Sequence, residues 1–269
     1  MKRVSSVILS VALLFSLCAC TGIPENGADT LPQSSYGTVQ LLEEISDMEE
    51  SSYRVGAGLL STDFSMIGQI LADKIEQEWD EFDRLSTEQR LLSSHAWGTV
   101  YIKADTWDEC EDAIGFLVDN PLESFEWLNK TGYFGMESAD PNHPVSHVEV
   151  TAHASRALSS LRITAGYCTE NVRVTLTATL SANDDTYTIG STDKGYVTYE
   201  NNHASTGSGI PVLIMTPDVA NNTGYYNGDY FSPTAYWVKD NVFYTLRASG
   251  EKTDRSEIQA TLEQILEEL

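Results

Sequence analysis

Residues 172–180, Val-Arg-Val-Thr-Leu-Thr-Ala-Thr-Leu, alternate strictly between apolar and polar side chains. Successive side chains of an extended strand point to opposite faces, so this run predicts a long strand with one apolar and one polar face. Similar alternation occurs in residues 148–152 and 161–167. Strands with one polar face are typical of antiparallel sheets, because parallel sheets are usually covered on both sides. The centre of the chain is therefore expected to form an antiparallel sheet.

Towards the C-terminus the sequence predicts further strands and then a helix. The run Pro211–Met215 is apolar throughout, which predicts an interior strand covered on both faces. Two apolar and aromatic runs, 236–238 and 242–246, flank Lys239-Asp240-Asn241, and because Asp and Asn tolerate positive φ a tight hairpin is expected there. From about Asp254 the apolar residues have helical spacing, which predicts a closing amphipathic helix.

Helical periodicity dominates the part of the chain before the strands. Apolar residues between Ile67 and Leu85 recur mostly at steps of three and four, which predicts a helix with a buried stripe and a cap near Ser61–Asp63. Ser86-Thr87-Glu88-Gln89 and Thr106-Trp107-Asp108-Glu109 have the pattern of capping boxes, and each predicts the start of a short helix. Asn120-Pro121 is expected to end the second of these helices.

The order of the elements predicts the fold class and the domains. Helices come first, strands follow and a helix ends the chain, which is typical of an α+β domain: an antiparallel sheet meander with N-terminal helices and a C-terminal amphipathic helix packed on it. We expect residues 61–269 to form this single globular domain. Residues 37–60 are acidic, with apolar residues at helical spacing, and are expected to be helical. Residues 20–36 are rich in small and polar residues and suggest a flexible tether.

The chain begins with MKRVSSVILSVALLFSLCAC, residues 1–20. Two basic residues precede an apolar run from Val7 to Leu17, which is too short to span a bilayer but suits a secretory signal peptide. Its end, Leu17-Cys18-Ala19-Cys20, resembles the lipobox of bacterial lipoproteins. That resemblance implies removal of residues 1–19 and attachment of diacylglycerol to Cys20. Cleavage after Ala19 by another signal peptidase and an uncleaved segment are the alternatives.

The composition limits the partners that this chain can have. It contains 16 basic and 40 acidic residues, a formal net charge of −24, and loss of Lys2 and Arg3 with the signal peptide would bring this to −26. Such a surface repels phosphate backbones, so no nucleic-acid partner is expected. It also repels anionic lipid. The lipid anchor alone is therefore expected to hold the protein at the cell membrane, facing outside the cytoplasm.

The cysteines could form a disulfide, and His143, His147 and His153 are the best candidates for a metal site. Cys110 and Cys168 are the two cysteines that remain after Cys18 and Cys20, and both a disulfide between them and two separate buried thiols stay open. His147, Glu149 and His153 would share one strand face, but the two histidines would lie roughly 20 Å apart, too far for one metal ion. A site that pairs Glu149 with one histidine stays open. We expect this face to be solvent-exposed, and we expect no cofactor.

The motifs of common enzymes are missing from the sequence. It contains neither the Gly-x-Ser-x-Gly of a nucleophile elbow nor a phosphate-binding Gly-Lys-Ser/Thr loop. Carboxylate pairs are too frequent in so acidic a chain to be diagnostic, so no catalytic residues are assigned and no enzyme is expected. Tyr225, Tyr226, Tyr230 and Trp237 could stack on a sugar or contact a protein partner. The alternative is that these rings fold over the edge of the sheet as part of the core.

The C-terminal region resembles a known family in two apolar motifs. Gly-Ile-Pro-Val-Leu-Ile, residues 209–214, is followed by Ala-Tyr-Trp-Val-Lys-Asp-Asn-Val-Phe-Tyr-Thr-Leu, residues 235–246, and by the closing helix. These motifs are similar to an uncharacterised domain of Gram-positive lipoproteins and of anti-sigma-factor extracytoplasmic regions, over about residues 98–269. The resemblance supplies no catalytic residues. The lipobox, the tether and the lack of a catalytic motif instead favour a non-enzymatic, membrane-anchored lipoprotein that binds a partner. The alternatives are a module for glycans or apolar ligands and an envelope-stress sensor.

Overall fold

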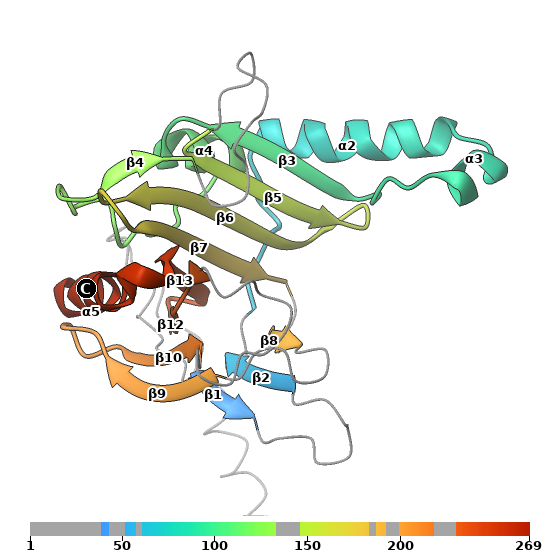
Figure 1. Ribbon diagram of the computed structural model, residues 1–269. Helices are drawn as coiled ribbons and strands as arrows, with labels where there is room; N and C mark the ends of the chain where they lie inside the picture. The colour runs from blue at the N-terminus through green and yellow to red at the C-terminus, as the bar shows by residue number, and fades with distance from the viewer. Residues whose placement is uncertain are drawn as a thin grey trace, which may run out of the picture. The chain divides into compact units, whose positions relative to one another are not determined.

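The computed structural model of this chain describes residues 39–42, 52–57, 61–132, 146–182, 187–191, 199–217 and 230–269. In chain order the elements are β1 (Val39–Leu42), β2 (Ser52–Ala57), α2 (Gln69–Arg84), α3 (Thr87–Leu92), β3 (Thr99–Ala104), α4 (Trp107–Ile114), β4 (Asn129–Thr131), β5 (Val148–Ala154), β6 (Leu158–Cys168), β7 (Arg173–Ser181), β8 (Tyr187–Ser191), β9 (Tyr199–Ser205), β10 (Pro211–Pro217), β11 (Tyr230–Phe231), β12 (Thr234–Lys239), β13 (Val242–Glu251), the 3₁₀ turn η1 (Lys252–Asp254) and α5 (Arg255–Glu268) (Figure 1).

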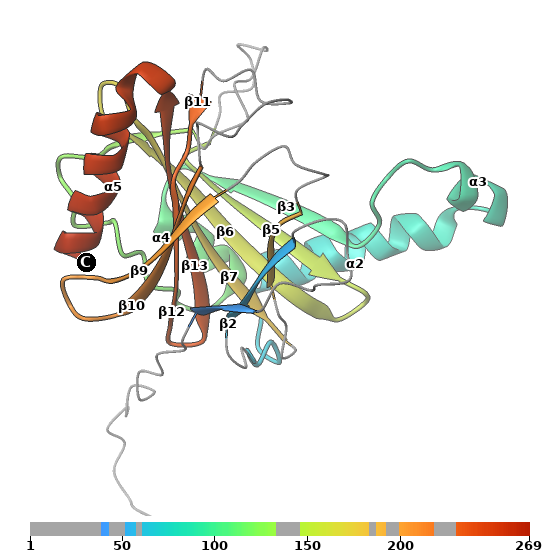
Figure 2. The ribbon, with the colours of Figure 1, turned by 60° about the horizontal axis from the view of Figure 1, so that its bottom comes forward.

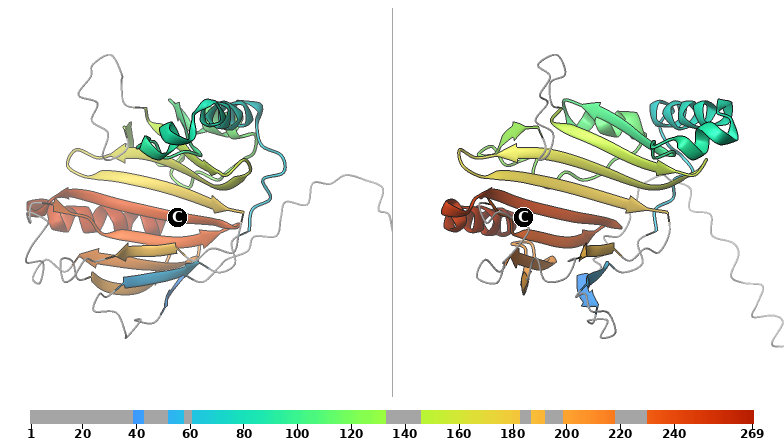
Figure 3. Two further views of the ribbon diagram at one scale, coloured as in Figure 1. Left: turned by 90° about the vertical axis from the view of Figure 1, so that its right-hand side faces the viewer. Right: turned by 45° about the vertical axis from the view of Figure 1, so that its right-hand side comes forward.

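Ten strands form one antiparallel sheet in the order β3-β5-β6-β7-β13-β12-β10-β9, with β4 paired to β6 and β11 paired to β13. Helices α2, α3 and α4 come before most of these strands and α5 comes after them, so the expected α+β fold is confirmed. The chain does not cross the sheet in sequence order. Instead β13, the last strand, lies directly beside β7 in the middle of the sheet (Figure 3).

The alternating run at 172–180 supplies the centre of the hydrophobic core. Val174, Leu176 and Ala178 are fully buried on one face of β7, as the alternation predicts. The register of the sheet brings apolar residues of the neighbouring strands into line with them. One row of partners crosses six strands and is buried throughout: Ile102, Val150, Ile163, Ala178, Tyr244 and Trp237.

The reverse face of the sheet changes from polar to apolar between its two ends. It is rich in threonine around β7, where Thr177 is an example, but at β12 and β10 it carries the buried Tyr236 and Leu213. A three-stranded sheet, β1-β2-β8, contacts this apolar end, where β1 lies against β10 and β12. The run Pro211–Met215 is therefore covered on both faces as predicted, with Val212 buried on one side and Leu213 on the other.

The expectation of a helix in residues 37–60 is wrong for the described part of that segment. Val39–Leu42 and Ser52–Ala57 are strands β1 and β2, which pair antiparallel with each other, and β2 also pairs with β8. The helical spacing depended in part on Ile45 and Met48, which lie outside the described residues. Pairing with partner strands far along the sequence outweighs the weak local helical preference.

Helix α2 begins later than the sequence suggests. The predicted cap was at Ser61–Asp63, but the helix starts at Gln69. Oδ1 of Asp63 instead accepts a hydrogen bond from the backbone N–H of Ser65, at 2.8 Å. Such a local side-chain bond offers the backbone an alternative to the helix. The predicted stripe is also narrower than expected, because Ile70 is 52% exposed.

The two predicted capping boxes start helices α3 and α4. Oγ of Ser86 accepts a hydrogen bond from the N–H of Gln89 at 3.2 Å, and the Gln89 side chain accepts one from the N–H of Ser86 at 2.8 Å. At α4 the Thr106 hydroxyl caps the N–H of Glu109 at 3.2 Å, but the Glu109 carboxylate accepts from the N–H of Asp105. The first box is complete and the second is shifted by one residue.

Helix α5 packs against β13 and closes the core (Figure 2). Its residues Ile258, Leu262 and Ile265 are buried in the same hydrophobic cluster as the central strands, which confirms the predicted amphipathic stripe. The backbone N–H of Gly207, in the turn between β9 and β10, donates to the carbonyl oxygen of Leu266 at 2.9 Å. The end of the helix is therefore also held by a backbone hydrogen bond.

Candidate functional site

A groove of about 980 Å³ lies beside helix α2. One face of α2, which includes Ile75, Glu76 and Trp79, lines it together with the segment 61–67 and the turn between β5 and β6. Ligand-binding pockets are usually roughly 300–1,000 Å³. The groove therefore has the size of a site for a small molecule or a short peptide.

The segment 61–67 is fixed to the end of the sheet by its own backbone. The N–H of Thr62 donates to the carbonyl oxygen of Ser181, at the end of β7, at 2.7 Å. The Phe64 ring lies 6.2 Å from the ring of Phe116, which follows α4. This part of the groove is thus connected both to the sheet and to the chain after α4.

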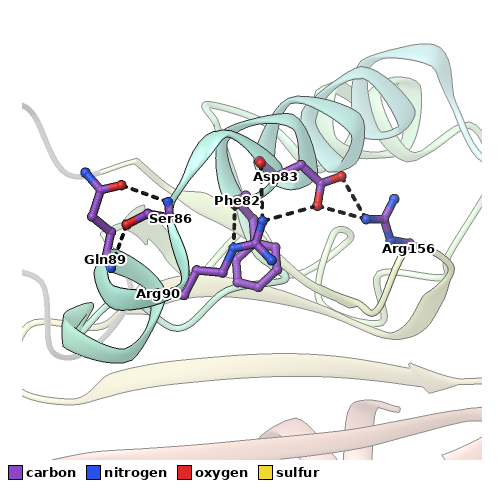
Figure 4. Close-up of polar contacts among 6 residues, drawn as sticks. All are labelled: Phe82, Asp83, Ser86, Gln89, Arg90 and Arg156. Atoms are coloured by element: carbon purple, nitrogen blue, oxygen red, sulfur yellow. Dashed lines mark hydrogen bonds and ion pairs between the residues drawn. The ribbon is translucent and has the colours of Figure 1, made fainter.

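Trp79 and Arg156 define the opposite part of the groove. The indole N–H of Trp79 donates to the carbonyl oxygen of Ala154 at 3.0 Å, which ties α2 to the end of β5. Arg156, in the β5–β6 turn, has φ +64°, and its guanidinium lies 5.5 Å from the centre of the Trp79 ring. The same guanidinium donates to both carboxylate oxygens of Asp83, at 2.8 and 3.0 Å (Figure 4). This cation is thus paired by a carboxylate that does not itself line the groove.

The far end of α2 continues past the strands and is joined there to α3 (Figure 2). The Arg90 side chain, on α3, donates to the backbone carbonyls of Phe82 and Asp83 at 3.1 and 3.2 Å, and its guanidinium lies 4.2 Å from the centre of the Phe82 ring (Figure 4). One side chain therefore caps the C-terminus of α2 and fixes the angle at which α3 follows it.

Large apolar side chains are exposed at both ends of α2. Seven are strongly exposed in the described part of the chain, and five of them lie at these two ends: Met66, Ile70, Leu91, Leu92 and Leu117. Leu117 belongs to this group because it follows Gly115, which contacts Gly68 directly. Clusters of exposed apolar residues are typical of interaction surfaces. Exposed apolar residues therefore lie near both ends of the helix whose middle lines the groove.

A contact between two glycines sets the position of α2. Helix α4 ends at Ile114 rather than at the expected Asn120-Pro121, because Gly115 adopts a left-handed conformation with φ +86°. The N–H of Gly68 donates to the carbonyl oxygen of Ile114 at 2.6 Å, and a Cβ on Gly115 would lie 2.6 Å from the Cα of Gly68. Only glycine fits here, so this contact holds the start of α2 against the end of α4.

Replacing Gly115 with alanine is expected to lower the free energy of unfolding by roughly 3 kcal/mol, because the residue must adopt positive φ and its Cβ overlaps backbone. Gly209 is the matched control: it has the same φ of +86°, but a Cβ there meets nothing within 4 Å. Gly209→Ala should cost about 1 kcal/mol, from the conformation alone. Urea denaturation measures both, and equal costs would contradict the role of the glycine contact.

The aromatic residues predicted to bind a ligand do not form one site in the described residues. Tyr225 and Tyr226 lie outside them. Tyr230 is exposed on β11, whereas Trp237 is only 1% exposed and stacks on Tyr244 with ring centres 5.2 Å apart. Trp237 borders a cavity of about 220 Å³, which is below the usual size of a ligand pocket. Its burial in the row of core residues across the sheet favours the alternative, in which this ring is part of the core.

Cys110 and Cys168 are both free thiols, so the disulfide that the sequence left open is not formed. Cys110 is completely buried on α4, and this burial raises the pKa of its thiol to about 12. A thiol in that environment stays protonated at neutral pH and behaves as a small apolar core residue.

The strand face that was expected to be solvent-exposed, residues 147–153, is buried at its beginning. His147 and Glu149 are 9% and 5% exposed, whereas His153 is exposed. Strand β5 is internal, paired with β3 and β6, and the His147 ring contacts that of Tyr167 edge to face. Burial lowers the pKa of His147. Within the described residues no group of three His, Cys, Asp or Glu side chains is arranged to hold a metal ion.

The sequence alone did not reveal the groove. Trp79 has the spacing of a core residue in the helical stripe, and Arg156 lies in a turn without a recognisable motif. The only usable signal was the mixture of hydroxyl and acidic residues at Ser61–Asp63, which indicated a helix cap. The groove arises because these three segments, distant in sequence, meet in the fold.

Comparison with models of protein families, with curated proteins and with solved structures finds no match to this chain. In the described residues no helix is long and apolar enough to cross a membrane.

Proposed function

We propose that this protein is a non-enzymatic, membrane-anchored lipoprotein that faces outside the cytoplasm and binds a ligand or partner in the groove beside α2. The observation that carries the binding function is the groove of about 980 Å³, with apolar and aromatic residues among polar ones. That composition is typical of ligand sites, where apolar contacts give affinity and a few polar groups give orientation. The lipobox at Cys20 supports the anchoring.

The walls of the groove also support a binding role. The Trp79–Ala154 hydrogen bond and the Thr62–Ser181 hydrogen bond attach its two sides to the ends of β5 and β7, two strands of the same sheet that are separated by β6. A preorganised site loses less conformational entropy when its ligand binds. The geometry thus favours recognition of a ligand of fixed shape, such as a short peptide or an oligosaccharide.

The proposed function can be tested by filling the groove. Ala157 is exposed and lines it, and Ala157→Trp should place an indole in the groove at little cost in stability. Ser155→Trp is the matched control, since Ser155 is exposed in the same turn but does not line the groove. Native mass spectrometry would measure complexes of the full-length protein, in detergent, with a mixed pentapeptide library and a panel of defined oligosaccharides.

We expect one-to-one complexes with the wild type and with Ser155→Trp, and an at least tenfold smaller bound fraction with Ala157→Trp. Similar melting temperatures for the three proteins would show that the tryptophans leave the fold intact. The proposal fails if the wild type binds neither set of probes, or if Ala157→Trp binds as well as Ser155→Trp.

A further inference from the structure

The carboxylates that line the groove outnumber its cations. Asp63, Glu76 and Asp80 line it, and Arg156 is the cation among the lining residues. Arg156 is already paired with Asp83, and Asp80 lies 3.5 Å from Arg84 in an exposed pair. Each of these pairs is neutral, so the groove keeps the negative charge of its two other carboxylates.

Asp63 and Glu76 are the source of that remaining negative charge. Among the described residues no ion pair joins either of them to a basic side chain. The N–H of Ser65 donates to the Asp63 carboxylate, and this hydrogen bond lowers the pKa of Asp63, so the group stays ionised at neutral pH. The net charge of −24 on the whole chain strengthens the same field.

Apolar side chains lie next to these carboxylates. Phe64, Ile67, Ile75 and Leu158 line the same groove. A lysine or arginine side chain matches such a surface, because its aliphatic stem packs on apolar groups while its charged end reaches carboxylates. Anionic ligands, anionic lipid and a second copy of this chain would all be repelled by the charge.

From this juxtaposition we infer that the groove beside α2 binds a peptide segment in which a lysine or arginine is flanked by apolar residues. The inference rests on the proposed binding function and adds the chemical class of the ligand. The basic end group lies against Asp63 and Glu76, and the apolar neighbours contact the apolar residues of the groove. A neutral oligosaccharide would use neither the charge nor the apolar surface to the same extent.

The experiment compares three peptides that differ at one position. Acetyl-Ala-Leu-Xaa-Leu-Ala-amide, with Xaa as lysine, norleucine or glutamate, is titrated against the full-length protein in detergent. The protein carries 5-fluorotryptophan at its five tryptophans, and fluorine NMR reports on each of them. Trp79 is the tryptophan that lines the groove, so binding there should shift its resonance most.

We expect the lysine peptide to bind at least tenfold more tightly than the glutamate peptide, with the norleucine peptide in between. Asp63→Asn with Glu76→Gln should weaken the lysine peptide about tenfold and abolish the preference. Asparagine keeps the oxygen that accepts from Ser65, so the local turn is preserved. Glu263→Gln with Glu267→Gln removes the same charge from the exposed side of α5 and should change affinity less than twofold.

The possible results separate two statements: that the groove binds a ligand, and that this ligand is a basic peptide. Equal affinities for the three peptides, with a shift of Trp79, would overturn the inference on basic ligands and leave the groove as a binding site. An unchanged lysine preference in the Asp63/Glu76 variant would overturn it as well. If no peptide shifts Trp79, the inference also fails, and oligosaccharide binding that Ala157→Trp blocks would then show that the groove serves another ligand class.

Discussion

Replacing Cys20 with serine is expected to move almost all of the protein from the membrane fraction to the soluble extracytoplasmic fraction. If Cys20 carries the diacylglycerol, the serine variant has no attachment site. A net charge of −24 also prevents adsorption to anionic lipid. Fractionation followed by immunoblotting measures the distribution.

Cys18→Ser is the matched control for this experiment. It makes the same substitution two residues earlier, at the free position of the lipobox and within the segment expected to be removed. Cys18→Ser should stay in the membrane fraction. Intact-mass spectrometry of the wild type should show the loss of residues 1–19 and an added acyl group. Retention of residues 1–19, or membrane attachment of the serine variant at position 20, would contradict the proposed anchor.

The elements that the sequence predicted well are those whose pattern is local and regular. The alternation at 172–180 depends only on neighbours along one strand, and the structure buries its apolar face as predicted. The turn at Asp240 and Asn241 is equally local, since both residues adopt positive φ of 51° and 61°, and it joins β12 to β13 as predicted. In each case a property of a few adjacent residues fixes the conformation.

The features that sequence patterns missed depend on contacts between distant segments. The strands β1 and β2 exist because they pair with each other and with β8, so the local spacing around Leu41 was misleading. The end of α4 at Gly115 depends on the approach of Gly68. The groove is the strongest example, because Asp63, Trp79 and Arg156 come from three segments that no sequence period connects. A candidate site of this kind can be found only from the fold.

Tyr230 and Trp237 also show that contacts between distant segments, and not local composition, decide where a side chain lies. Tyr230 and Trp237 are seven positions apart and of similar chemical type, so composition could not separate a ligand-binding ring from a core ring. Register separates them. Trp237 is the partner of Tyr244 on the core face. Tyr230, on the short strand β11, pairs with Glu251 of β13 and stays 62% exposed. Two aromatic side chains of similar chemistry therefore lie in different places: Trp237 is in the core and Tyr230 is at the surface.

Replacing Trp237 with alanine is expected to lower the free energy of unfolding by about 3–5 kcal/mol. The indole is 1% exposed and stacks on Tyr244 with an angle of 10° between the rings, so its removal leaves a large cavity and also loses an aromatic pair. Tyr230→Ala removes an aromatic ring that is mostly exposed and should change stability by less than about 0.5 kcal/mol. Denaturant unfolding followed by circular dichroism measures both variants.

The pair of variants also separates the two interpretations of Trp237. If it belongs to the core, Trp237→Ala lowers stability but leaves the affinity of the groove for its ligand unchanged under conditions in which the variant is folded, because Trp237 does not line the groove. If it contacted a ligand, the variant would keep its stability and lose binding. A loss of stability below about 1 kcal/mol would contradict the burial of Trp237, since truncation of a buried tryptophan cannot be that small in a closely packed core.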